Sequence, residues 1–152
     1  MHYNNILVTT DFSELSKQAF DVAAYHAKTE ECRITLIHVL ESFHIPPELQ
    51  KVIWTPGQVK SMEKNYLEAA TKELEEIANT CFHGESVETV CLLSEHPPGT
   101  EIANYAKEHN CDLIVMASSG RGSMSQLLLG STVQKILSAS SCSVLIVPSA
   151  KK

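Results

Sequence analysis

Five short apolar runs, alternating with segments of helical spacing, constrain the fold of this chain more than any other feature. The runs span residues 5–10, 33–40, 86–93, 112–117 and 143–147. Strands that are apolar at nearly every position are typically buried on both faces of a sheet, and helices between them make consecutive strands parallel. With right-handed crossovers, this order predicts one α/β domain over residues 1–152: a doubly wound, five-stranded parallel sheet, Rossmann-like, with helices on both faces.

Apolar spacing also predicts where helices lie between these runs. Ser13 is a suitable N-cap for a first helix that turns Leu15 and Ala19 to one face. Thr55-Pro56 opens a longer helix, because proline is tolerated at the first helical position. The apolar stripe along this helix, whose spacing fits one helical face, consists of Val59, Met62, Tyr66, Leu67, Ala70, Leu74 and Ile77.

The stretch 41–54, between the second run and the long helix, is the least regular part of the sequence. It contains Pro46-Pro47 among several apolar side chains. We expect a loop packed over its own core, and a flap that binds a partner is the alternative. The apolar side chains concerned are Phe43, Ile45, Leu49, Val52, Ile53 and Trp54.

Charge and cysteine usage restrict the classes of partner. The chain has 152 residues with 12 Lys+Arg and 18 Asp+Glu, a formal net charge of -6. This balance argues against bulk electrostatic binding to nucleic acid or anionic membranes, but it leaves room for a small phosphate site. The five scattered cysteines show no zinc-like spacing, which predicts reduced thiols in the cytoplasm and no metal ligands from protein side chains. The histidines stand alone, and we expect them at the surface or as hydrogen-bonded core residues.

Two strand ends carry the residues best suited to bind a ligand, because open α/β sheets bind ligands beyond the carboxyl ends of their strands. The first run ends in Thr9-Thr10, and Asp11 follows it directly. Asp11 would repel phosphate, so its useful role is toward ribose hydroxyls or a base amino group. After the fourth run, residues 117–129 lead to Gly130-Ser131-Thr132, which opens a helix. A nucleotide lying across both strand ends would satisfy both groups.

The segment after the fourth run has features of a phosphate site. Gly120 and Gly122 allow the main chain to approach an anion closely, and Arg121 between them supplies a cation. Ser131 and Thr132 add hydroxyl donors at a helix start, where unpaired N–H groups attract negative charge.

A purely structural interpretation accounts for the same residues. Ser131-x-x-Gln134 matches a capping box, and the two glycines match turn residues. The Asp11 side chain can simply hydrogen-bond to the main chain of its own loop. The chain lacks GxxxxGK[ST], a GxGxxG after the first run and a GxSxG elbow, so a P-loop enzyme and a hydrolase triad are not supported. No paired base and nucleophile can be assigned, and we expect no catalytic residue.

The chain resembles the universal stress protein family over nearly its whole length. Residues 6–13 are similar to the first strand and loop of that family, and residues 35–39 to its second strand. The most specific signature follows residues 112–116. The ATP-binding branch carries G-x-x-G, nine residues, then G-[ST], and here Gly120, nine residues and Gly130-Ser131 match that register.

This resemblance implies the sheet order 3-2-1-4-5 and an ATP-binding, dimeric regulatory or sensor module with at most slow ATP hydrolysis, Mg²⁺ entering with ATP. It implies that the adenosine half lies at Asp11 and Val39 and the phosphates at the two glycine segments. Dimerisation would use the last strand, through Val144, Leu145, Ile146 and Val147. The implied nucleotide-binding residues are Thr9, Thr10, Asp11, Val39, Met116, Ala117, Gly120, Arg121, Gly130, Ser131, Thr132 and Val133.

Two departures from the family pattern bear on this site. Ala117 stands where the first glycine of the signature is expected, and Thr9 stands where a proline is common. Both changes are expected to lower nucleotide affinity. They leave open a second hypothesis, a dimeric stress-response interaction protein that no longer binds nucleotide. A hydrolase or transferase of adenosine nucleotides is a third and weaker hypothesis.

Overall fold

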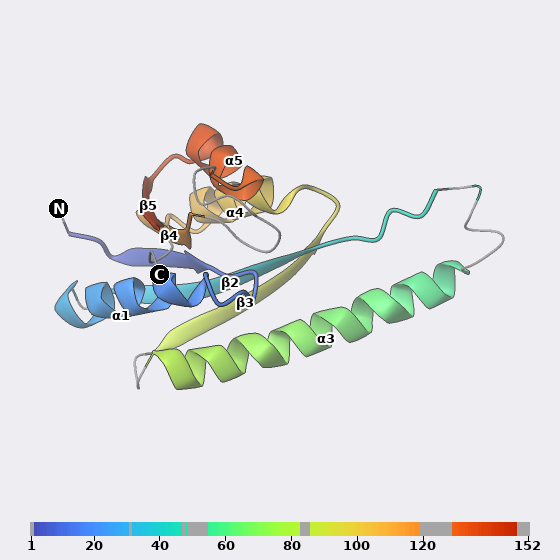
Figure 1. Ribbon diagram of the computed structural model, residues 1–152, viewed down its shortest axis with the longest axis horizontal. Coiled ribbons are helices and arrows are strands. Elements are labelled where there is room, and N and C mark those ends of the chain that lie inside the picture. Colours follow the sequence, from blue (N-terminus) through green and yellow to red (C-terminus); the bar gives the residue numbers. More distant parts are fainter. Residues whose placement is uncertain are drawn as a thin grey trace.

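The fold is a parallel sheet covered by helices on both faces, as Figure 1 shows for the computed structural model. The structure describes residues 2–30, 32–46, 48, 55–82, 86–118 and 129–148. Its strands pair side by side and in parallel in the order β3-β2-β1-β4-β5. The predicted fold class and strand order are therefore confirmed. The strands are β1 (Asn5–Thr9), β2 (Arg33–Glu41), β3 (Val87–Ser94), β4 (Leu113–Ala117) and β5 (Ser143–Val147).

Helices form one layer on each face of this sheet. α1 (Lys17–Glu30) and α3 (Pro56–Cys81) cover one face, and α4 (Pro98–Glu108) and α5 (Ser131–Ala139) cover the other. None of the helices in the described ranges combines the length and the apolar character that crossing a membrane requires.

The starts of α1 and α3 follow the sequence signals. α3 begins at Pro56 as predicted, and the Oγ1 of Thr55 accepts a hydrogen bond from the Gln58 N–H at 3.3 Å. The Oγ of Ser13 accepts from the Ser16 N–H at 3.3 Å, which is the hydrogen bond of an N-cap. Regular α1 nevertheless begins only at Lys17, after a turn.

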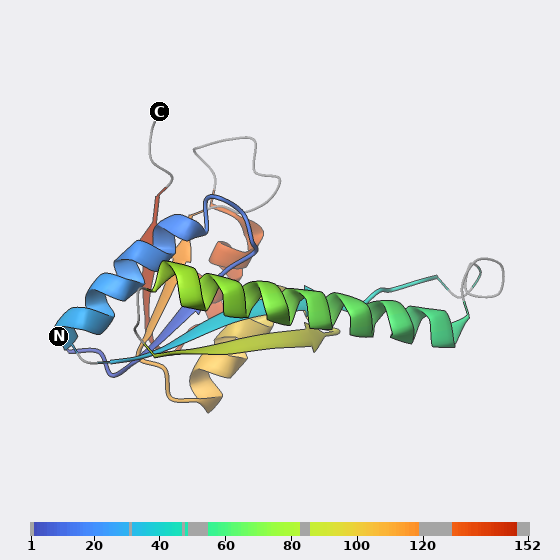
Figure 2. The ribbon, with the colours of Figure 1, turned by 90° about the horizontal axis from the view of Figure 1, so that it is seen from below.

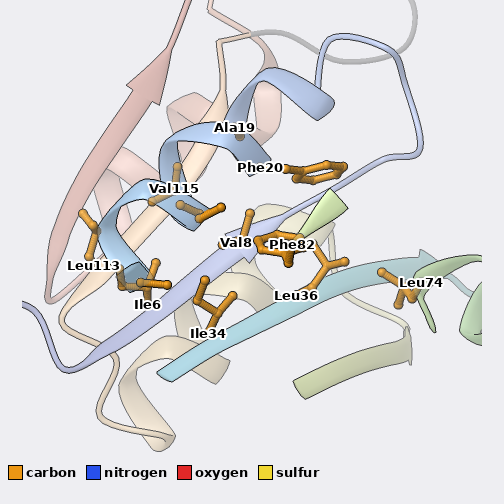
Figure 3. Close-up of a cluster of buried hydrophobic side chains, with 13 residues drawn as sticks. Ile6, Val8, Ala19, Phe20, Ile34, Leu36, Leu74, Phe82, Leu113 and Val115 are labelled. Carbon is orange, nitrogen blue, oxygen red and sulfur yellow. The ribbon is translucent and has the colours of Figure 1, made fainter. Parts of the chain in front are cut away.

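Alternation along the strands sends side chains into two apolar cores, one on each face of the sheet. Ile6 and Val8 of β1 point into the core beneath α1 and α3, where the rings of Phe20 and Phe82 lie 5.7 Å apart (Figure 3). Leu7, between them in sequence, belongs to the second core beneath α4 and α5. Burial on both faces explains why the strands are apolar at nearly every position.

α3 and the ends of β2 and β3 extend together past the other strands (Figures 1 and 2). Within the apolar stripe of α3, Ala70 and Leu74 are buried, but Tyr66 is 54% exposed. The other members of the stripe are half-buried. The apolar face is therefore covered less completely along the N-terminal half of α3, because that half projects past the end of the sheet (Figure 2).

The residues after β2 lie along this projecting half of α3. The Phe43 ring is 5.7 Å from the Tyr66 ring, and the Phe43 N–H donates to Oε1 of Glu63 at 3.1 Å. Phe43 is 44% exposed, so its side chain is not buried as a packed loop would require, whereas Ile45 is half-buried. Leu49, Val52, Ile53 and Trp54 lie outside the described residues.

β5 forms one edge of the sheet, and all its residues are half-buried. The Ser143 N–H donates to the Asp112 carbonyl at 3.3 Å, and the Val147 carbonyl accepts from the Ser118 N–H at 2.9 Å. In a parallel strand the N–H and C=O of one residue point to the same side, and successive residues alternate. The main-chain groups of Val144 and Ile146 therefore point to the open edge.

Candidate functional site

The carboxyl ends of β1 and β4 lie side by side, as the sequence interpretation required. Val8 pairs with Val115, so Thr9 and Met116 follow one residue later on neighbouring strands. Beyond β4, the Gly130 N–H donates to the Ser118 carbonyl at 3.2 Å, which fixes the start of α5 at this same end. Asp11 and the Gly130-Ser131-Thr132 segment thus share one end of the sheet.

The loop after β1 is held by its own short side chains. The Thr10 N–H donates to the Ile37 carbonyl at 3.0 Å, and the hydroxyls of Thr10 and Ser16 lie 3.0 Å apart. The Oδ1 of Asp11 accepts from the N–H of Ser13 at 3.0 Å and from its hydroxyl at 2.5 Å. These bonds orient the half-buried Asp11 carboxylate, which is the role in its own loop that the structural interpretation gave it.

Four of the predicted site residues share the face that α4 and α5 cover. Val39, Met116 and Val133 belong to the apolar core of that face and are at most 7% exposed. Thr9 lies two residues after Leu7 on β1, so its side chain points to the same side as that of Leu7, and it is 8% exposed. Val39 and Met116 therefore form an apolar floor. Val133 is buried within it and would reach a ligand only through its main-chain N–H.

The start of α5 differs from the predicted capping box. The N-cap is Gly130, which offers no side-chain hydrogen bond, and Ser131 is the first helical residue. The Gln134 side chain instead donates to the Leu129 carbonyl at 2.9 Å. The capping-box interpretation of Ser131 is therefore wrong, and Ser131 is exposed with Thr132 half-buried beside it. The first N–H groups of a helix have no partner within the helix, which makes such a start suited to an anion.

Two predicted phosphate ligands, Gly120 and Arg121, lie outside the described residues. Ala117, the residue that replaces a family glycine, is the last residue of β4 and is half-buried. Across the described ranges, no three His, Cys, Asp or Glu side chains form a group that could hold a metal ion.

His38 was not among the predicted site residues, yet it contacts the loop after β1. Its Nδ1 lies 2.8 Å from the Thr10 carbonyl oxygen, and its ring lies 4.2 Å from the Phe12 ring. The signal available in the sequence was its place beside Val39 on the strand that neighbours β1. A single histidine without a motif gave no further indication.

Comparison with known proteins agrees with the fold and the order of its elements. A family model described as "Universal stress protein family" matches residues 2–148. Universal stress protein YxiE of Bacillus subtilis is 29% identical over 146 residues, which cover 95% of this chain and 99% of that protein.

Solved structures show the same architecture. The structure of MJ0577, a protein of Methanocaldococcus jannaschii, superposes with a TM-score of 0.83 at 24% identity, and each chain is covered completely. A universal stress protein crystallised in complex with cAMP superposes with a TM-score of 0.66 at 21% identity, covering 99% of this chain and 100% of that one.

Proposed function

This chain belongs to the universal stress protein family, and from that premise we propose that it binds an adenine nucleotide, with ATP as the expected ligand. The observation that carries the proposal is the Gly130–Ser118 hydrogen bond, which brings the start of α5 to the strand ends beside the Asp11 loop. A member of the same family has been crystallised with cAMP, an adenine nucleotide, which supports the choice of ligand class.

The chemistry of the described residues suits the two halves of such a ligand. Val39 and Met116 offer apolar surface for a base, and the Asp11 carboxylate can accept hydrogen bonds from ribose hydroxyls or an amino group. The N–H groups at the start of α5 and the hydroxyls of Ser131 and Thr132 can donate to phosphate oxygens. The sequence adds Gly120 and Arg121 on the phosphate side, and Mg²⁺ would enter with ATP.

We assign no catalytic residue to this site, so nucleotide occupancy is proposed to act by regulation in the cytoplasm. Asp11 is engaged by Ser13, and the neighbouring hydroxyls of Thr10 and Ser16 bond to one another. Among the described residues of the site we therefore assign no general base, and any ATP hydrolysis should be slow. The alternative function is an interaction protein of the same fold that binds no nucleotide.

Ser131→Asp tests the site without weakening the helix. A carboxylate at the first position of α5 stabilises the helix start but repels phosphate. Calorimetric titration with Mg-ATP should give a well-defined affinity for the parent protein and at least a tenfold loss for Ser131→Asp. Ser61→Asp, which adds the same charge at an exposed position of α3, should bind as the parent does.

Thermal unfolding provides the second arm of this test. Ligand at 100 times its dissociation constant should stabilise the fold by about 2.7 kcal/mol, which raises the Tm by roughly 5–10 °C. A shift with ATP but not with GTP is expected. If neither nucleotide shifts the Tm at millimolar concentration, the binding proposal fails and the interaction protein takes its place.

We further propose that two copies associate through β5. This edge strand is apolar, and the main-chain N–H and C=O groups that it directs to the open edge can pair with a second strand. Ile146→Pro removes an N–H that points to the open edge, while Ile146→Ala shortens the same side chain and keeps the N–H. Light scattering after gel filtration should report a monomer for the proline variant and a dimer for the alanine variant. Dimers of both variants would contradict pairing through this edge.

A further inference from the structure

The loop that carries Asp11 contains a residue in an unfavourable conformation. Phe12 has a φ of 62°, in the left-handed region that side chains other than glycine seldom occupy. Its N–H donates to Oγ1 of Thr10 at 3.0 Å. Such a conformation persists only where its surroundings hold it in place. The contacts that hold Phe12 therefore also decide where Asp11, the preceding residue, is presented.

His38 supplies two of those contacts from the neighbouring strand. Its Nδ1 lies 2.8 Å from the Thr10 carbonyl oxygen, and its ring packs against the Phe12 ring at 4.2 Å between centroids. Thr10 and Phe12 flank Asp11 on either side. His38 thus contacts both neighbours of the residue proposed to meet the nucleotide.

The Nδ1 contact also fixes the position of a proton. A carbonyl oxygen can only accept, so the Nδ1 of His38 must carry hydrogen and donate it. When the ring is neutral, His38 is therefore the Nδ1–H tautomer, a state set by the hydrogen bond that this nitrogen makes.

We propose that His38 is a positioning residue of the nucleotide site: it holds the Thr10 carbonyl and the Phe12 ring so that Asp11 faces the ligand. The inference rests on the proposed nucleotide binding for its functional consequence. Its structural part, a loop fixed by the His38 ring, is independent of any ligand. A core histidine without this role would satisfy its own polar atoms and leave the Asp11 loop unchanged when replaced.

Two substitutions separate the hydrogen bond from the ring. His38→Phe keeps an aromatic ring against Phe12 and removes the donor, whereas His38→Asn keeps a donor close to the place of Nδ1 and removes the ring. Loss of one hydrogen bond to a group left unpaired should weaken Mg-ATP binding by about tenfold in His38→Phe. His38→Asn should recover part of that loss. His26→Phe, the same change on α1 where the His26 ring lies 6.0 Å from the Tyr3 ring, should bind as the parent does.

Nuclear magnetic resonance of the nucleotide-free protein tests the structural part by itself. Ring nitrogen spectra should show hydrogen on Nδ1 of His38, and His38→Phe should shift the amide signals of Asp11, Phe12 and Ser13 where His26→Phe does not. A proton found only on Nε2 would overturn the proposal, and so would unmoved amide signals. The first result is read from the parent protein, so the test remains even if only the asparagine variant can be purified. If the parent protein binds no nucleotide while these spectra behave as expected, the nucleotide proposal fails and the loop contact stands.

Discussion

Gly99 lies against Thr132 so closely that a Cβ atom on Gly99 would meet the Thr132 carbonyl oxygen at 2.9 Å. The same atom would meet the Cβ of Lys135 at 2.8 Å. Neither neighbour is the far end of a flexible side chain, so any side chain at Gly99 requires one helix to move. The start of α4 is therefore packed on the main chain of α5, one residue from Ser131. A change at this contact should therefore alter both the packing of α4 on α5 and the proposed phosphate site.

Gly99→Ala should consequently destabilise the fold and weaken nucleotide binding. Forcing an atom into a closely packed contact costs about 1–3 kcal/mol, which urea denaturation would detect. Gly57→Ala is a matched control, because each glycine directly follows the proline that begins its helix and a Cβ at Gly57 meets nothing within 4 Å. That control should be neutral or stabilised by up to about 1 kcal/mol. Equal stability of the two variants would contradict the close approach of α4 to α5.

Asp112 joins β1 to β4 at the amino end of the sheet, opposite the proposed site. Its Oδ2 accepts from the Asn4 N–H at 2.8 Å and its Oδ1 from the Asn5 N–H at 3.1 Å. Asp112→Ala leaves both donors without this acceptor and should cost about 1–3 kcal/mol in urea denaturation. Asp112→Asn, which keeps one oxygen, should cost less. Mg-ATP affinity should stay unchanged in both variants, and a loss of affinity would show that the two ends of the sheet are coupled.

Because burial varies along α3, shortening a side chain to alanine should lower the free energy of unfolding by different amounts at its two ends. Leu74 is fully buried between α3 and the sheet, so Leu74→Ala should cost about 2–5 kcal/mol through lost burial and the cavity left behind. Tyr66, two turns earlier, is 54% exposed and touches Phe43. Tyr66→Ala should cost less than about 1 kcal/mol. Similar costs in urea denaturation would mean that the projecting half of α3 is covered in solution, for example by a second copy of the chain.

The strands could be predicted from the sequence, because a strand buried on both faces needs apolar residues at nearly every position. Leu7 and Val8 illustrate this, since they are neighbours in sequence and lie in opposite cores. The buried extent of α3 could not be predicted. Periodicity reports which face of a helix is apolar, but the length of sheet beneath that face is decided by other strands, so Tyr66 and Leu74 look alike in sequence and differ in the structure.

The site was predictable in its main-chain positions and less so in its side chains. Asp11 and Gly130 follow the ends of strands that become neighbours, and the strand order followed from the family resemblance. The contact of His38 with Thr10 depends on the register of β1 against β2, in which Thr9 pairs with Ile37. Register is a property of two strands together, so neither segment alone indicates which side chain reaches the loop.

The thiol of Cys111 should react with an alkylating reagent more slowly than an ordinary free thiol does, because its thiolate form is disfavoured. Burial raises the pKa of Cys111 from 9.0 to about 11, and the nearby Cys142 and Asp112 add to the rise. At pH 8 this lowers the thiolate fraction about a hundredfold, and the thiolate is the species that reacts. Iodoacetamide labelling of the native protein, followed by peptide mass spectrometry, should show this difference against a free cysteine derivative in the same solution.

The pH dependence of the labelling rate shows whether the pKa of Cys111 is raised or lowered. Between pH 9 and pH 11 the free thiol passes from half to fully ionised and its labelling rate levels off, whereas the rate at Cys111 should keep rising until the pH passes its own pKa. Unfolding in guanidinium chloride removes the burial that causes the shift, so Cys111 should then label as the free thiol does. Fast labelling of native Cys111 at pH 8 would contradict the half-buried position of its thiol against the core that α4 and α5 cover.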